Sequence, residues 1–179
     1  MSPSPPAPII VTALLGAEDL AWADSLRRKH FPAGRNQLPA HLTLFHHLPP
    51  SALDSLRRLL SGEARTTARP AARISRLMSL GQGVALAVES PGLAAIRARI
   101  ADALHGQLMP QDQAAWRPHI TIQNKVPPSA ARALLQALQK EFSPRPVEIT
   151  GLALHYYRGG PWELIAESRF SRSGPFRRS

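Results

Sequence analysis

Two His-x-Thr tripeptides, His41-Leu-Thr43 and His119-Ile-Thr121, are the residues in this chain whose types and spacing could do chemistry. With 7 His and 6 Thr among 179 residues, random placement would give only about 0.2 such tripeptides. Two imidazoles with pKa values near neutral can serve as general base and general acid on one substrate. The threonine hydroxyls can hydrogen-bond phosphate oxygens. The motifs therefore predict in-line displacement at phosphorus, which requires no metal in principle.

Each motif opens a repeated segment. Residues 41–60 align with residues 119–138 without a gap, and 8 of the 20 positions are identical. In both copies the motif is followed by Pro-Pro-Ser-Ala and then by leucines at helical spacing. Two copies are too few for a solenoid, which normally needs about three repeats. The repeat therefore indicates two related halves, each contributing one histidine and one threonine.

Alternating strands and helices must position these motifs. Hydrophobic patterning predicts strands over 9–15, 41–47, 71–80, 84–89, 119–126, 147–157 and 162–170, and helices over 18–30, 51–62, 90–104 and 129–142. Because residues two apart in a strand project to the same side about 7 Å along, each motif presents its histidine and threonine to one surface. The pattern predicts an α+β (α/β-like) fold in which two pseudo-twofold-related lobes share a central groove.

Composition favours a single globular domain with an anionic partner. A hydrophobic content of 44% can build a core, and we expect one domain over residues 8–170, with motif segments at 39–60 and 117–138. Residues 1–7 are expected to be a flexible Pro-rich segment and residues 171–179 a flexible basic tail. The net charge of +10 suggests RNA or another phosphate-bearing ligand, although a bias toward solvated surface arginine is an equal alternative.

Other features limit the class of protein. No signal peptide and no apolar run of 18 residues is found, so we expect a cytoplasmic monomer that makes no membrane contact. The absence of cysteine excludes disulfides and thiolate chemistry.

The paired motifs resemble those of the two-histidine phosphoesterase superfamily, specifically its bacterial 2′-5′ RNA ligase-like and RNA 2′,3′-cyclic phosphodiesterase branch. The approach Trp116-Arg-Pro-His119 and the closing segment Tyr157-Arg-Gly-Gly-Pro-Trp162 are also similar to that branch. The resemblance implies two lobes, each an antiparallel sheet backed by helices, and opening of 2′,3′-cyclic phosphates to 2′-phosphates without a cofactor. It further implies that some members join or cleave 2′-5′ linkages in RNA.

The chain departs from this family where the substrate would be held. Ligase-like members often carry Phe five residues after the first histidine and Arg five after the second, where this chain has His46 and Asn124. Strand alternation places Phe45 and Lys125 on the same face as the motif histidines. Phe45 is therefore a candidate for stacking on a base, and Lys125 for supplying the positive charge that Arg supplies in the family. Arg117, two residues before the second histidine, is a further candidate for phosphate contact.

Two alternatives remain open at this stage. A zinc site formed by His41, His46, His47 and His119 is disfavoured, because His-x-Thr lacks ligand spacing and no nearby carboxylate or cysteine completes a shell. An RNA- or nucleotide-binding module with little turnover would use the same groove and basic surface. The intact histidine and threonine pairs favour the enzyme.

Overall fold

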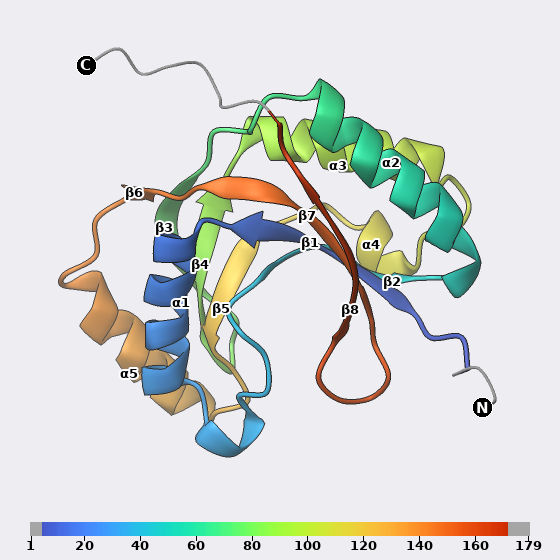
Figure 1. The fold of residues 1–179 in the computed structure, drawn as a ribbon. Coiled ribbons are helices and arrows are strands. Elements are labelled where there is room, and N and C mark those ends of the chain that lie inside the picture. Colours follow the sequence, from blue (N-terminus) through green and yellow to red (C-terminus); the bar gives the residue numbers. More distant parts are fainter. Residues whose placement is uncertain (1–4, 172–179) are drawn as a thin grey trace, which may run out of the picture.

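Eight antiparallel strands form one continuous, curled sheet in the computed structural model, which describes residues 5–171 (Figure 1). The strands are β1 (Ile9–Leu15), β2 (Leu42–Leu48), β3 (Arg73–Ser79), β4 (Val84–Glu89), β5 (His119–Gln123), β6 (Arg145–Pro146), β7 (Ile149–Tyr156) and β8 (Glu163–Arg169). Their spatial order is β6-β3-β4-β5-β2-β1-β7-β8. The helices are α1 (Ala17–His30), α2 (Leu53–Thr66), α3 (Pro91–Ala103), α4 (Pro110–Gln113) and α5 (Pro128–Gln139), with 3-10 turns η1 (Ala33–Arg35) and η2 (Pro50–Ala52).

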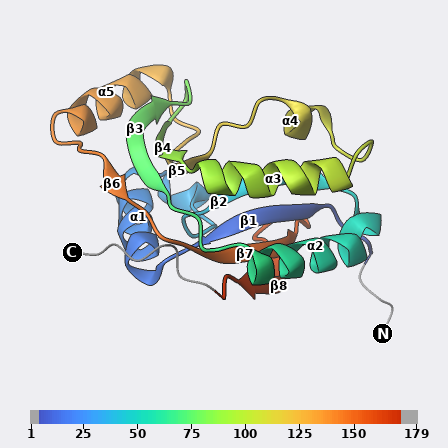
Figure 2. The same cartoon turned by 90° about the horizontal axis from the view of Figure 1, so that it is seen from above.

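The two motif strands lie side by side in the middle of this sheet. β5 and β2 pair with each other, so the four strands of one half (β6-β3-β4-β5) continue into the four strands of the other (β2-β1-β7-β8). The expected α+β architecture is confirmed, but the halves share one sheet where two were expected. Helices α1 and α5 lie at one end of the sheet, and α2 and α3 at the other (Figures 1 and 2).

In each half, one helix contacts the motif strand of the other half. α1 connects β1 to β2, yet it packs against β5. α3 lies between β4 and β5 in the chain, yet the guanidinium of Arg97 on this helix donates from Nε to the carbonyl of Leu44 in β2 at 2.8 Å. Both motif strands are therefore supported by distant parts of the chain.

The core consists of the strand faces turned away from the groove and the helix faces that cover them. Leu42 and Leu44 of β2 and Ile120 and Ile122 of β5 have no exposed surface. α3 buries Leu93, Ile96 and Ile100, a helical spacing that was predicted, and Ser90 caps its first turn by accepting from the Leu93 N–H at 3.2 Å. None of the helices within residues 5–171 has the length and apolarity needed to cross a bilayer.

Two sequence predictions differ from the structure in detail. α2 was expected to end near Gly62 but continues to Thr66, because Ala64 still packs into the core. The short helix α4 lies between the predicted helix 90–104 and the predicted strand 119–126, where no helix was predicted. Within the segment 1–7, which is expected to be flexible, Pro5 and Pro6 are exposed, Ala7 is buried and the Pro5 carbonyl accepts from Arg158 at 2.6 Å. The rest of that segment, residues 1–4, and residues 172–179 of the predicted basic tail lie outside the described residues.

Candidate active site

The pairing of β2 with β5 brings the two motifs together. Leu42 lies opposite Ile120 in an antiparallel register. In such a ladder the preceding residue of one strand faces the following residue of the other, which sets His41 beside Thr121 and Thr43 beside His119. All four side chains lie on the face opposite the buried Leu42 and Ile120. The result is a square of alternating imidazoles and hydroxyls with a local twofold axis at its centre.

Both imidazoles are held in the same way. His41 Nδ1 lies 2.9 Å from the carbonyl oxygen of Pro39, and His119 Nδ1 lies 2.7 Å from that of Arg117. A carbonyl can only accept, so each Nδ1 carries the hydrogen. This sets the tautomer and leaves Nε2 of both rings for proton transfer in the groove.

Only one residue pair joins β2 to β5, and two long side chains donate hydrogen bonds to other backbone carbonyls of these strands. Trp116 Nε1 donates to the Thr43 carbonyl at 3.1 Å, and Arg27 Nη1 donates to the Thr121 carbonyl at 2.8 Å. An unpaired carbonyl in this setting would cost free energy. These two bonds therefore hold the backbone of both threonines.

The four motif residues line one cavity of about 350 Å³. Arg97 and Arg117 also line it, as do His46 and Trp162. The Arg97 guanidinium is fixed by its bond to Leu44, by a 2.9 Å bond to the Asp112 carbonyl and by stacking on aromatic rings. Fixed positive charge beside two imidazoles and two hydroxyls suits a phosphate group.

Trp162, next to the start of β8, covers His41. The two ring centroids lie 4.6 Å apart. The His155 ring centroid lies 5.6 Å from that of Trp162, and His155 Nε2 lies 2.9 Å from the Thr12 hydroxyl. Burial is the largest cause that lowers the pKa of His41 to about 4, and the charges of Arg27, His155 and His119 lower it further against the opposing Pro39 bond. His41 is therefore neutral near pH 7, as a proton acceptor must be.

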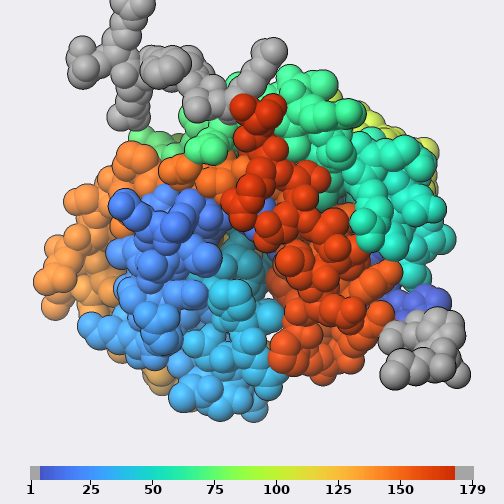
Figure 3. All heavy atoms as spheres, viewed as in Figure 1, coloured from blue at the N-terminus to red at the C-terminus, as the bar shows by residue number. Residues whose placement is uncertain are grey.

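Trp162 and His41 also line two cavities that adjoin the catalytic cavity. The surface in Figure 3 is hollowed between the blue segment that holds α1 and the orange-red β7–β8 hairpin. An apolar cavity of about 330 Å³ between these elements is lined by Leu20, Leu38 and Leu164, and it reaches His41 and Trp162.

His46 is a third imidazole of the catalytic cavity, and a buried carboxylate orients it. Asp112 Oδ1 lies 3.2 Å from His46 Nδ1, and the same carboxylate accepts from the backbone N–H groups of His46 at 2.8 Å and His47 at 3.0 Å. Burial alone would raise the pKa of Asp112, but these hydrogen bonds lower it overall. The ionised carboxylate thus fixes α4 against β2 and orients the ring of His46, which lines the cavity.

Replacing Asp112 by asparagine should weaken both this anchor and substrate binding. An amide offers one acceptor oxygen in place of two, so we expect a loss of roughly 2 kcal/mol in unfolding free energy and a fall in Tm of roughly 4–8 °C. KM should rise more than kcat falls, since His46 lies outside the histidine–threonine square. Asp102→Asn, an exposed change on α3, is the control. An unchanged Tm in Asp112→Asn would contradict the anchoring role.

The prediction that Phe45 stacks on a base is wrong. Its side chain has no exposed surface and packs in the core, with the Arg97 guanidinium 4.6 Å from its ring centroid. The register between β1 and β2 shifts between the pairs Val11–Phe45 and Thr12–Thr43. Such a bulge turns the next side chains to the other face of a strand, so alternation from Thr43 fails at Phe45.

The two predicted cations lie at different places. Arg117 lines the cavity that holds both histidines, where the sequence placed it. Lys125 follows the end of β5 in a left-handed backbone conformation, φ 61°, and lines a neighbouring hollow instead. Sequence reasoning missed Arg97, Asp112 and Trp162 as parts of the site. The only local signal for any of them was the family-like segment that ends at Trp162.

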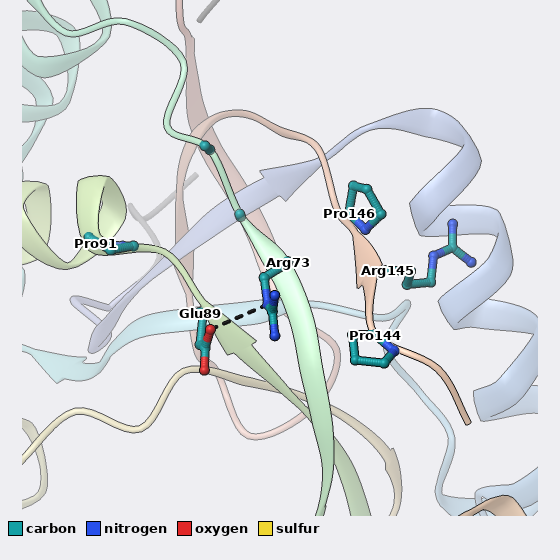
Figure 4. Close-up of a pocket in the computed structure, with 8 residues that line it drawn as sticks. Arg73, Glu89, Pro91, Pro144, Arg145 and Pro146 are labelled. Atoms are coloured by element: carbon teal, nitrogen blue, oxygen red, sulfur yellow. Dashed lines mark ion pairs between the residues drawn. The ribbon is translucent and has the colours of Figure 1, made fainter. Parts of the chain in front are cut away.

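A separate hollow of about 350 Å³ lies far along the sheet from the histidines, between β3, β6 and the start of α3 (Figure 4). Arg73 and Glu89 form an ion pair there at 3.3 Å, and Arg145 points away toward α1, where it pairs with Asp19 at 2.9 Å. The arginines of this hollow are paired with carboxylates, so the hollow is less suited to bind an anion than the groove is. Within residues 5–171 no three His, Asp or Glu side chains are grouped to hold a metal ion.

A curled antiparallel sheet whose two central strands each present histidine and threonine to one cavity defines the two-histidine phosphoesterase class. The chain belongs to the 2′-5′ RNA ligase superfamily, whose family model matches residues 16–161 and so includes both motifs. The resemblance predicted from the motifs is confirmed, and the protein is an enzyme of this ligase and phosphoesterase superfamily. No curated protein sequence gives a significant match.

Solved structures share the fold. TT0787 of Thermus thermophilus has a TM-score of 0.65 at 17% identity, with 93% of this chain and 100% of that one covered. E. coli LigT complexed with NADP+ has a TM-score of 0.59 at 20% identity, and LigT complexed with 3′-AMP has 0.59 at 18%; both comparisons cover 94% of this chain and 100% of LigT. At such identities the likeness concerns the fold.

Proposed function

We propose that this protein opens 2′,3′-cyclic phosphates of RNA ends or nucleotides to 2′-phosphates, with His41 and His119 as the acid–base pair. The observation that carries the proposal is the square formed by His41, Thr43, His119 and Thr121 at the floor of one cavity. Solved relatives such as LigT bind nucleotides, which supports a nucleotide-like substrate.

The chemistry requires one proton acceptor and one proton donor on opposite sides of phosphorus. Neutral His41 takes a proton from water through Nε2 while the water oxygen bonds to phosphorus. The bond from phosphorus to the 3′ oxygen breaks, and protonated His119 gives its proton to that oxygen. The 2′-phosphate and a free 3′ hydroxyl result.

The remaining polar groups of the cavity bind the negatively charged oxygens of the phosphate. Thr43 and Thr121 lie beside the opposite histidine and donate their hydroxyl hydrogens to the non-bridging oxygens. Arg97 and Arg117 oppose the negative charge that grows on those oxygens in the transition state. If a ribose 5′ hydroxyl takes the place of water, the same proton transfers form a 2′-5′ linkage, which would account for ligase activity.

Product analysis tests this proposal. The wild-type protein is incubated in EDTA with adenosine 2′,3′-cyclic phosphate and with a short RNA that ends in a 2′,3′-cyclic phosphate, and the products are separated by chromatography. Turnover that persists in EDTA and yields the 2′-phosphate is expected. A 3′-phosphate product would reverse the assigned leaving group, and no turnover of either substrate would reject the proposal.

The low pKa of His41 predicts an unusual pH dependence. As the base, His41 works only when neutral, so kcat/KM should fall as pH drops through about 4, whereas an ordinary histidine would cause the fall near 6.5. Measurement of kcat/KM between pH 3.5 and 7 reports this ionisation of the free enzyme. A fall on the acid side that is centred near 6.5 instead of near 4 would contradict a His41 base whose pKa is lowered by burial.

A further inference from the structure

The groove continues past the catalytic histidines into a second hollow of about 370 Å³. This second hollow shares His41, Thr121 and Trp162 with the catalytic cavity. Its other walls come from the end of α1, the η1 turn, the connection between β5 and α5, and the turn of the β7–β8 hairpin. A ligand whose phosphate lies between the histidines can therefore reach into it directly.

A buried, unneutralised guanidinium lies in the wall of this second hollow. Arg27 is only 3% exposed. Of its five N–H groups, Nε donates to Asn36 Oδ1 at 3.2 Å and Nη1 donates to the Thr121 carbonyl at 2.8 Å. Within residues 5–171 no carboxylate lies at ion-pair distance from Arg27. The Oδ1 of Asp24 on the same helix is engaged by the Ala40 N–H at 2.5 Å.

Two more cations face the same space. Arg35 and Lys125 are exposed and line the hollow, together with the amides of Gln37 and Asn124. No Asp or Glu is among the lining residues that the structure describes. Asp24 acts on Arg27 only from beyond ion-pair distance, so the three positive groups still repel one another, and a buried charge is usually paired more closely. An anion in the hollow would relieve both costs.

Structural support of β5 explains only part of this arrangement. The bond from Arg27 to Thr121 uses one of its N–H groups, and it gives no reason for Arg35 and Lys125 to gather beside it. Arg97, which supports β2 from the other half, differs because both Nε and Nη2 donate to backbone carbonyls. The aromatic residues Phe31 and Tyr157 add apolar walls suited to a sugar or a base.

We propose that the second hollow binds a second phosphate group of the substrate, which is not cleaved, through Arg35, Lys125 and the groove-facing edge of Arg27. This inference rests on the proposed function, because the cleaved phosphate is placed between His41 and His119. It specifies the substrate class as cyclic phosphates that carry another phosphate close by, either a terminal 5′-phosphate or the preceding phosphodiester of an RNA strand.

Two measurements on the full chain test it. The first compares kcat/KM for adenosine 2′,3′-cyclic phosphate, for its 5′-phosphorylated form and for the dinucleotide ApA ending in a 2′,3′-cyclic phosphate. The second measures by calorimetry the binding of two product analogues, adenosine 2′-phosphate and adenosine 2′,5′-bisphosphate, which needs no turnover. Both are done at low ionic strength, where screening is weak.

The test variant is Arg35→Gln/Lys125→Asn, since asparagine tolerates the left-handed conformation at position 125. Arg28→Gln/Lys29→Asn is the matched control: it removes the same charge from exposed positions of α1 that do not line the hollow. Arg27 is left intact because it holds the Thr121 backbone.

The wild type should prefer substrates with a second phosphate by about tenfold or more, the effect of one charge-assisted contact. The test variant should lose that preference while its rate on adenosine 2′,3′-cyclic phosphate stays within about twofold of wild type, and the control should keep the preference. Whichever extended substrate shows the gain identifies the source of the phosphate. Equal rates on all three substrates, or an equal loss on all three in the test variant, would overturn the inference.

The binding measurement separates this inference from the proposed function. Tighter binding of the bisphosphate, lost in the test variant, would support the second phosphate site even if no cyclic phosphate were hydrolysed. Turnover without any gain in affinity from the second phosphate would leave the proposed function standing and reject the site.

Discussion

Replacement of either His41 or His119 by alanine will lower kcat/KM for adenosine 2′,3′-cyclic phosphate by at least about 100-fold, the usual scale of general acid–base catalysis. Each imidazole presents only Nε2 to the groove because its Nδ1 is bound to a carbonyl two residues earlier. We expect neither His46 nor His155 to take over that position, since His46 is bound to Asp112 and His155 to the Thr12 hydroxyl. Steady-state kinetics on the purified variants, with EDTA present, measure the loss.

The double variant sharpens the test. Two groups that act in one step give non-additive losses, so His41→Ala/His119→Ala should be little worse than the poorer single variant. His47→Ala is the control, because His47 is exposed on the same strand and does not line the cavity. Thermal unfolding of all variants should stay close to wild type. A histidine variant that keeps more than about a tenth of the activity would reject that histidine as an acid or base.

Replacement of Gly83 by alanine will destabilise the protein by about 3 kcal/mol or more, a fall in Tm of roughly 6–12 °C. Gly83 directly precedes β4, and a methyl group there would overlap the Gln123 carbonyl oxygen and lie 2.6 Å from the carbonyl carbon. It would also lie 2.7 Å from the Asn124 Cα atom. These are backbone atoms, so relief requires the end of β5 to move.

That movement would reach the catalytic site, because Thr121 lies only two residues before Gln123 in β5. Activity of Gly83→Ala should therefore fall more than its folded fraction does. Gly62→Ala is the matched control: Gly62 lies within α2, and a methyl group there would meet nothing within 4 Å. It should raise stability by roughly 0.5–1 kcal/mol. Equal melting temperatures for the two variants would contradict the close approach of β4 to β5.

Local patterns were sufficient for most of the secondary structure and for the reactive residues. β1 and β4 have the predicted bounds, and α1 begins one residue before its predicted start, because hydrophobic periodicity records which face of an element is buried. The repeated His-x-Thr motifs led to the family and to the four residues that meet in one cavity. Duplication made this possible, since a single histidine in a strand has no such context.

Tertiary structure decided how the site is held and where its charges lie. The bonds from Arg27 to Thr121, from Arg97 to Leu44 and from Asp112 to His46 join residues 94, 53 and 66 positions apart. Periodicity does not encode such pairs, because they depend on which helix crosses to which half of the sheet. A bulge likewise moved Phe45 into the core. The sequence alone determined the reactive groups and their class of chemistry, whereas their orientation, their burial and the second cationic hollow arise only when distant segments pack together.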